Sequence, residues 1–334
     1  MSEHTADGVG SNDEREGMSR RGFIAGAAGL TGVALSGVWR GSPARAAEGG
    51  SSVGRATTPS GKEFLLIDGV VIGAVTQFTG GTPVGVLAND EIKDPYIHKH
   101  IAGVKYEEIS VKFGLNMSTP VYDWISEFMA GKKTSHNGSV VATDGSNNIK
   151  SRVDFTNALI TEVGFPALDA ASKEPAGMTL KFQPATTRYR VATGNVTPPS
   201  GTGKAWLPGN FRLSIEPLDC SRVAKIGAFT VKQSSISIEK IEVTPLQFTL
   251  SDTSSKTWRV HMDSFVVRNS GKELDGKLEV LNIALDKTLA TIEFGHMGIY
   301  RLEPDRPSPG GDGIKRLEAE FYCEEIAFTY QKVI

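Results

Sequence analysis

The sequence has few of the residues with which proteins bind metals or form covalent intermediates. Its 334 residues include only two cysteines and six histidines. The H-E-x-x-H, P-loop and C-x-x-C motifs of metallopeptidases, nucleotide hydrolases and redox proteins are missing. Four glutamates on expected strands could suggest a hydrolytic pair, but carboxylates there more often form a solvated face: Glu239, Glu242, Glu324 and Glu325. The sequence therefore favours a protein that is not an enzyme and has no cofactor.

Charge of either sign is not in excess. The chain has 36 Lys and Arg against 38 Asp and Glu, a net charge of −2. This balance gives no electrostatic basis for binding nucleic acid or an anionic membrane surface. The 39% hydrophobic content and 37 glycines instead indicate a globular, β-rich chain that is long enough for two domains.

Long hydrophobic runs are also absent. The weakly apolar stretch 23–38 is interrupted by glycines and is shorter than the about 20 residues of a membrane-spanning helix. It follows two adjacent arginines and precedes a small-x-small cleavage pattern, as in a twin-arginine signal peptide. The residues that carry this signal are Arg20, Arg21, Phe23, Ala44 and Ala46. We expect export by that route to the periplasm or the outside of the cell, with membrane contact only during export.

The two cysteines, Cys220 and Cys323, both lie in expected strands of the C-terminal half. An even number of cysteines in an exported protein is compatible with one disulfide. Two separate buried thiols, which pack as small apolar side chains, fit the sequence as well.

Alternating apolar residues predict β-strands through most of the chain after residue 61. Ile109, Val111, Phe113 and Leu115 fall on one face of such a strand, with polar residues between them. One helix follows. Its signals are Thr119 as the N-cap, Pro120 in the first turn, Gly131 at the end, and an apolar stripe. The stripe predicts three core residues, Trp124, Ile125 and Phe128.

The order of these features repeats after a Gly- and Pro-rich segment. Trp258 and Met262 begin a second helical stripe, although the valines after them also allow a strand. We interpret the pattern as a tandem duplication, with two unrelated β domains as the alternative. The predicted parts are a signal peptide (1–46), a flexible segment (47–61), domain 1 (62–191), a linker (192–209) and domain 2 (210–334).

Metal sites are weakly indicated. His98 and His100 occupy alternate strand positions and so share a face, but zinc needs at least three protein ligands. The Asp144-Gly145-Ser146 stretch lacks the spacing and the closing glutamate of a calcium loop, and a hairpin turn explains it. His261 and His296 each stand among apolar residues, which predicts packed or hydrogen-bonded histidines rather than catalytic ones. We therefore expect no metal.

Residues 104–190 resemble the tail tube proteins of contractile phages, and through them the tube proteins of type VI secretion and extracellular injection systems. The second half is similar only in its pattern and lacks the Tyr-Asp-Trp segment. The segments that carry the resemblance are His100–Tyr106, Tyr122–Ile125, Asn137–Val141 and Phe155–Ala158.

The resemblance implies a mainly β (α+β) fold, with a partly rolled β-barrel and one helix per unit. It further implies that six units form a ring with a continuous inner barrel, and that rings stack into a tube. The stretch 80–103 would be an extended loop that contacts the next ring. The residues expected at this contact are His98, His100, Gly103 and Lys105.

Two units in each chain allow two assemblies. Three chains close a pseudo-hexamer if the units lie side by side, and six chains form a two-layer ring if they are stacked. The sequence thus favours an exported, non-enzymatic protein that assembles with itself and with other tube or injection-system components. A secreted monomeric binding protein or hydrolase with the same fold is the alternative.

Overall fold

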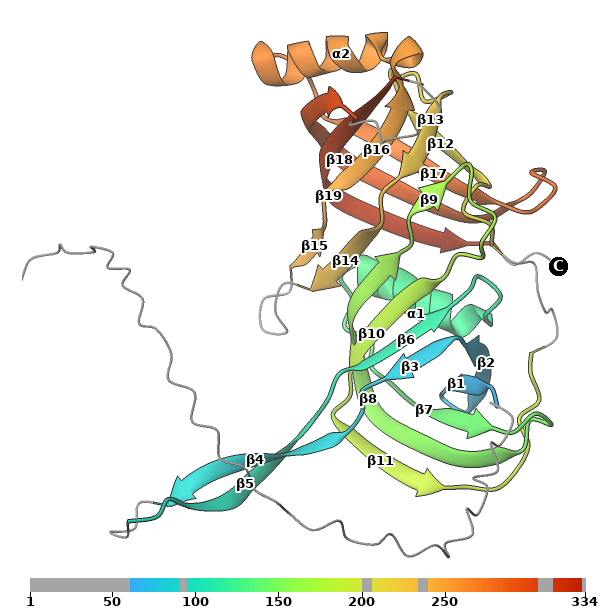
Figure 1. Cartoon of the computed structure of the whole chain (residues 1–334), viewed down its shortest axis with the longest axis vertical. Coiled ribbons are helices and arrows are strands. Elements are labelled where there is room, and N and C mark those ends of the chain that lie inside the picture. The colour runs from blue at the N-terminus through green and yellow to red at the C-terminus, as the bar shows by residue number, and fades with distance from the viewer. Residues whose placement is uncertain (1–60, 91–94, 200–205, 234–239, 306–314, 332–334) are drawn as a thin grey trace, which may run out of the picture. The chain divides into compact units, whose positions relative to one another are not determined.

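The computed structural model describes residues 61–90, 95–199, 206–233, 240–305 and 315–331 (Figure 1). The predicted signal peptide therefore lies outside the described residues, as does nearly all of the segment 47–61. The described residues belong to one compact unit. Below, residues 61–199 are called the first half and residues 206–331 the second half. No helix in the described part of the chain is long and apolar enough to cross a membrane.

Strands dominate the first half, as the alternating pattern predicted. Its elements are β1 (Glu63–Ile67), β2 (Val70–Val75), β3 (Gln77–Thr79), β4 (Pro83–Asp90), β5 (His98–Tyr106), β6 (Ile109–Phe113), α1 (Thr119–Met129), β7 (His136–Thr143), β8 (Ile149–Phe165), β9 (Leu168–Asp169), β10 (Met178–Gln183) and β11 (Thr186–Val191).

The second half repeats this order with fewer strands. Its elements are β12 (Phe211–Ile215), β13 (Val223–Ile226), β14 (Phe229–Gln233), β15 (Ile241–Val243), β16 (Leu246–Ser251), the 3-10 turn η1 (Asp252–Ser254), α2 (Lys256–Met262), the π-helical turn η2 (Asp263–Val267), β17 (Leu274–Leu281), β18 (Thr288–Pro304) and β19 (Arg316–Tyr330). The mainly β fold with one helix in each half is therefore confirmed.

The two large sheets share one strand order. The first contains the path β1-β7-β8-β10-β6-β3, and the second contains β12-β17-β18-β19-β16-β13, all antiparallel. The hairpin β4–β5 follows β3 and precedes β6. The pair β14–β15 follows β13 and precedes β16 in the same way.

Irregularities recur at matching positions of the two long strands. In β8 the extra bulge residue opposite β10 is Thr161, and in β18 the extra residue opposite β19 is Tyr300. Each strand also has one non-glycine residue with positive φ, Asn157 (45°) and His296 (52°). Because bulges and left-handed residues are specific local features, their agreement fixes which residues of the two halves correspond.

The two helices bury equivalent tryptophans. Trp124 in α1 is 1% exposed and its Nε1 donates to the Thr134 carbonyl at 2.9 Å. Trp258 in α2 is fully buried and donates to the Asp219 carbonyl at 2.9 Å. The helix predicted in the first half is confirmed, and the second stripe is helical rather than a strand.

The start of α1 differs by one residue from the prediction. The helix begins at Thr119, and Ser118 is the N-cap. The Ser118 amide donates to the Ile72 carbonyl at 2.7 Å and its hydroxyl to the Val71 carbonyl at 3.2 Å. These bonds to β2 hold the helix start one residue earlier than the local signals indicated.

The segment predicted as a linker is attached to the core at both ends. Val196 is 3% exposed and packs with Phe64 and Val141, and its amide donates to the Asn147 carbonyl at 3.0 Å. Trp206 is 3% exposed in the main core. Residues 200–205 lie outside the described residues.

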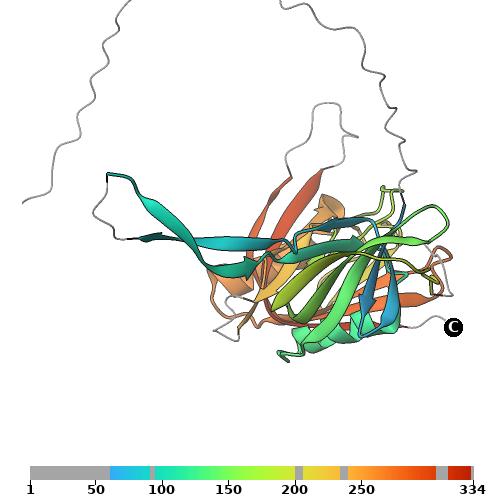
Figure 2. The ribbon, with the colours of Figure 1, turned by 90° about the horizontal axis from the view of Figure 1, so that it is seen from below.

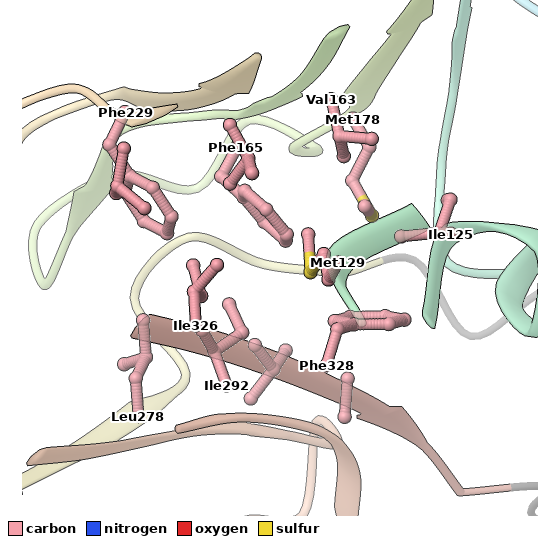
Figure 3. Packing of buried hydrophobic residues seen from close by; sticks show 14 of the residues in the cluster. Ile125, Met129, Val163, Phe165, Met178, Phe229, Leu278, Ile292, Ile326 and Phe328 are labelled. Carbon is pink, nitrogen blue, oxygen red and sulfur yellow. The ribbon is translucent and has the colours of Figure 1, made fainter. Parts of the chain in front are cut away.

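The main core is continuous between the halves. One buried cluster joins residues of α1, β8 and β10 to residues of β14, β18 and β19. In Figure 3, Phe165 and Phe229 lie beside each other, while Ile326 and Phe328 of β19 approach from the opposite side. The two halves are therefore packed together rather than tethered.

Candidate assembly interface

The two halves are joined by strands that leave one sheet and enter the other. After β13, which belongs to the second sheet, the chain continues into β14, which pairs with β8 of the first half. The register runs from Phe229 opposite Phe165 to Lys232 opposite Glu162. A second, shorter exchange pairs β9 of the first half with β13. The sheet of the first half is thus extended by strands of the second.

Aromatic side chains fill this joint. The Phe165 and Phe229 rings stack with centroids 4.7 Å apart and an interplanar angle of 17°. Phe229 also meets Phe294 edge-on at 5.7 Å. Phe165 and Phe229 are 3% and 2% exposed. Buried aromatic pairs in these orientations stabilise a contact beyond the area they bury.

The helix α1 forms the other part of the joint, against β19. The Tyr122 and Tyr330 rings stack with centroids 3.9 Å apart. The Ser126 hydroxyl donates to the Phe328 carbonyl at 2.7 Å, and the Tyr330 hydroxyl donates to the Leu115 carbonyl at 3.2 Å. Burial raises the pKa of Tyr122 well above its ordinary value, so this ring stays neutral. We call the contacts of β14 with β8 and of β19 with α1 the inner joint.

In contrast, the hairpin β4–β5 pairs with no other strand among the described residues. Figures 1 and 2 show it running away from the two large sheets. Its apolar side chains are exposed, at 45–63% of their area: Val84, Leu87, Ile101 and Val104. Exposed apolar strands attract other strands unless something covers them.

The residues expected at an inter-ring contact all lie on this hairpin. His98, His100, Gly103 and Lys105 belong to β5, so the structure gathers them on one exposed element. The His100 Nδ1 lies 2.8 Å from the Asp90 Oδ1 on the facing strand. Whether they contact another ring stays a prediction.

The metal and hydrolytic candidates do not form a site within the described residues. No group of three His, Cys, Asp or Glu side chains there could hold a metal ion. Asp144 closes a hairpin turn, accepting from the amides of Ser146 (2.9 Å) and Asn148 (3.0 Å). The hydrogen bond from the Asn148 side chain, and next the bond from the Asn148 amide, hold the pKa of the Asp144 carboxyl well below its ordinary value.

Three of the four glutamates expected on a solvated face lie within the described residues. Glu242 forms an ion pair with Lys232 at 3.4 Å, on β15 and β14. Glu324 and Glu325 are exposed on β19. Glu239 lies outside the described residues.

The two histidines expected to be packed or hydrogen-bonded behave differently. His261 is 8% exposed and stacks on Phe265, as predicted, and burial lowers its pKa. His296 is not packed, but it has polar partners, which was the other half of the prediction. Its side chain is 55% exposed and its Nδ1 lies 3.4 Å from a Glu273 oxygen. Its backbone is left-handed, with φ of 52°, and its amide donates to the Asp275 carboxylate at 3.2 Å.

The two cysteines are free thiols, so the disulfide is not formed. Cys323 is buried and Cys220 is half-buried. Burial raises the pKa of each thiol to about 11. Both therefore fit the alternative of separate, unreactive thiols.

Sequence reasoning missed the strand exchange. The β14 segment FTVKQ alternates like any half-buried strand, and nothing in it shows which sheet it joins. The only sequence signal for the exchange was the position of β14 in the duplicated order. It takes the place of β4, which does not pair with the sheet of its own half.

Comparison with known protein families gives a match in the first half of the chain. Residues 92–185 match the family model of the T4-like virus tail tube protein gp19. This confirms the resemblance inferred from the sequence, over β5 to β10. A search of curated proteins gave no match.

Solved structures of low similarity also match, among them the following two. One is a chain of the PVC sheath–tube complex of an extracellular contractile injection system in its extended state. It is 14% identical, with 41% of this chain and 94% of that chain covered and a TM-score of 0.37. The other comes from the tube-terminating cap of the anti-feeding prophage, with 15% identity, coverage of 40% and 91%, and a TM-score of 0.36.

Proposed function

We propose that this protein is a structural, self-assembling component of a ring or tube built from tail-tube-like units. Each chain supplies two units, residues 62–191 and 210–334, joined by residues 192–209. Other partners would be further components of a tube or injection system. The protein has no catalytic role in this proposal.

The inner joint is the observation that carries the proposal. A strand of one unit extends the sheet of the other, and a helix of the first packs on the last strand of the second. A repeated unit that adds its strand to the next unit's sheet can continue indefinitely or close into a ring. The match of residues 92–185 to a tail tube family supports the same conclusion.

The assembly state of the full chain tests this function. Size-exclusion chromatography with multi-angle light scattering, followed by negative-stain imaging, is expected to show rings or tubes at micromolar concentration. A clean monomer over that range would contradict the proposal and favour the monomeric binding protein instead.

We also propose that residues 1–46 direct export through the twin-arginine route. Arg20 and Arg21 precede the weakly apolar stretch, and the receptor reads such an arginine pair as an address. Since this route carries folded proteins, the two units would fold and pack before export.

Replacing both arginines with lysine is expected to keep the precursor in the cytoplasm, as measured by immunoblot of cell fractions. The matched control is Arg40→Lys with Arg45→Lys, which should export normally. Normal export of the first variant, or loss of wild-type export in a strain lacking only the general secretory route, would refute this assignment.

A further inference from the structure

The edge of β8 that pairs with β14 in the inner joint has an equivalent in β18 that is unpaired among the described strands. The matching bulges at Thr161 and Tyr300 make the β8 segment Glu162–Phe165 equivalent to the β18 segment Arg301–Pro304. In β8 this edge is filled by β14. In β18 the partner strand β17 begins at Leu274, opposite Met297, and no described strand pairs with the same edge from Gly298 to Pro304.

The strand equivalent to β14 is β4, on the exposed hairpin. The Thr82 carbonyl accepts from the Glu107 amide at 3.0 Å, and the Thr230 carbonyl accepts from the Thr244 amide at 2.9 Å. In each half this bond stands at the base of the hairpin, immediately before the ladder of the two strands begins. Thr82 therefore corresponds to Thr230, and Pro83 to Val231.

The helical part of the inner joint has an exposed counterpart as well. Tyr189 pairs with Val153 of β8, and Phe328 pairs with the equivalent Ile292 of β18. Phe328 is 4% exposed beneath α1, whereas Tyr189 is 65% exposed. Its neighbour Val191, on the same face of β11, is 81% exposed.

The helix α2 carries the matching apolar residue. Counting from the equivalent tryptophans, Val260 takes the place of Ser126, whose hydroxyl bonds β19 in the inner joint. Val260 is 61% exposed, and Val267 of the following turn is 72% exposed. Four elements are thus exposed where their equivalents make the inner joint. In the first half they are β4 and β11, equivalent to β14 and the end of β19. In the second half they are β18 and α2, equivalent to β8 and α1.

We propose that these four elements bind a second copy of this chain, head to tail. The β18 edge 298–304 of one copy receives β4 of the next, in the register of the inner joint, so that Thr82 lies opposite Glu303. The helix α2, through Val260, covers Tyr189 and Val191 of the same neighbour. This inference rests on the proposed function, because it names the surfaces through which the chain assembles.

Two prolines at the proposed contact remove main-chain N–H donors that the inner joint has. Because the Thr82 carbonyl faces β5, the backbone of Pro83 faces the open edge. The Asp305 amide donates to the Arg316 carbonyl at 2.9 Å, so Pro304 likewise faces the open edge of β18. Proline has no N–H, and its presence at an unpaired edge discourages pairing with unrelated strands.

The joint between copies consequently lacks two main-chain donors that Val231 and Phe165 provide inside the chain. It also lacks the Phe165–Phe229 stack, since Gly81 and Pro304 occupy those positions. The apolar contact of α2 with β11 must supply most of its binding energy. Assembly would therefore be weaker and more dependent on concentration than the association of the two halves.

Cysteine cross-linking tests the strand register on the full chain. Thr82→Cys with Glu303→Cys would place two Cβ atoms about 4.5–5.5 Å apart in a non-hydrogen-bonded pair, and oxidation is expected to give covalent oligomers on a non-reducing gel. The matched control, Thr82→Cys with Arg301→Cys, puts the thiols two residues out of register, where the diagonal spacing of about 7–8 Å disfavours a disulfide. Each single cysteine variant reports linkage through the native thiols.

Charge substitutions test the helical contact. Tyr189→Asp or Val260→Lys is expected to raise the dissociation constant of the oligomer by about tenfold or more, as losses at buried contact centres do. The double variant should recover part of the loss, since opposite charges then face each other. The control Ile283→Asp changes a residue that is 58% exposed but lies outside the four elements, and it should leave assembly unchanged.

The outcomes separate the two proposals. A wild-type monomer at all accessible concentrations overturns the proposed function and this interface with it. Oligomers that persist in both charge variants, without the Thr82–Glu303 cross-link, overturn the interface while the proposed function stands. Oligomers that cross-link at Thr82–Glu303 and weaken in both charge variants support both.

Discussion

At the scale of single residues, the two buried tryptophans show how each unit is stabilised. Trp124 contacts Phe182 with ring centroids 5.5 Å apart, and Trp258 contacts the equivalent Phe321 at 5.9 Å. Each indole also donates to a backbone carbonyl outside its helix. In both units the tryptophan therefore packs the helix on the sheet and also donates a hydrogen bond to a backbone carbonyl outside the helix.

Truncation of Trp124 should destabilise both halves of the chain, because they share one core. Trp124→Ala is expected to lower the free energy of unfolding by about 3–5 kcal/mol, as large aromatic truncations in cores do. Trp124→Phe keeps most of the packing but loses the bond to Thr134, so it should lose clearly less. Denaturant titrations followed by circular dichroism measure both, and an unchanged unfolding midpoint for Trp124→Ala would contradict the packing.

The buried thiols predict a loss of stability at alkaline pH. The pKa of Cys220 and of Cys323 is raised to about 11 from an ordinary value of 9.0. Between these values the folded state keeps protons that the unfolded state has released, so the unfolding free energy falls as pH rises. Melting temperatures should decline from about pH 9 to pH 11, and the decline should be shallower in Cys220→Ser with Cys323→Ala. Identical pH profiles would show that the thiols are not responsible.

At the scale of elements, β14 and β4 are equivalent strands of the two units that lie in different environments. Both strands follow an equivalent bond at Thr230 or Thr82, but β14 is buried in the neighbouring sheet and β4 is exposed. The strands differ in length and in edge chemistry, since Pro83 stands where the inner strand has Val231. We infer that this difference separates the permanent joint from the one made between chains.

Restoring the missing donor should strengthen assembly. Pro83→Val copies the inner strand and supplies an N–H toward the open edge, so the oligomer should dissociate at a lower protein concentration than wild type. Dilution series followed by light scattering measure the change, with Pro184→Val outside the hairpin as the control. Equal or weaker association of the Pro83 variant would argue against pairing through β4.

At the scale of the whole molecule, the inner joint bears on symmetry. The two units lie side by side, sharing a sheet through β8 and β14 and a helix contact through α1 and β19. If the joint between chains repeats the relation within the chain, units alternate around a ring and every chain contributes two. This arrangement favours the trimer over the stacked hexamer.

Native mass spectrometry of the assembled protein decides between these assemblies. A closed species of three chains is expected, because six units would then complete a pseudo-hexamer. Six chains without a three-chain species would support stacking. Monomers and dimers alone would exclude both closed forms.

Much of the fold was predictable from the sequence because it depends on local pattern. Period-two alternation, as in Ile109 to Phe113, makes one face of a strand apolar, and Pro120 with Gly131 marks the ends of a helix. The resemblance to tail tube proteins came from short segments within residues 100–158, which the family match then confirmed. The exposure of His296 was not predictable, because a left-handed backbone at a non-glycine residue has no clear signal in the sequence.

The sequence by itself determined the strands, the first helix and the repeated order, because side-chain periodicity decides which face is buried. Only the tertiary structure decided which edges are paired. Edge pairing uses main-chain N–H and C=O groups that almost every residue has, so the pattern of β14 looks the same whether it joins its own sheet or the next. The role of Pro83 and Pro304 also became clear only from the tertiary structure, because the direction of their backbone shows that both face an unpaired strand edge.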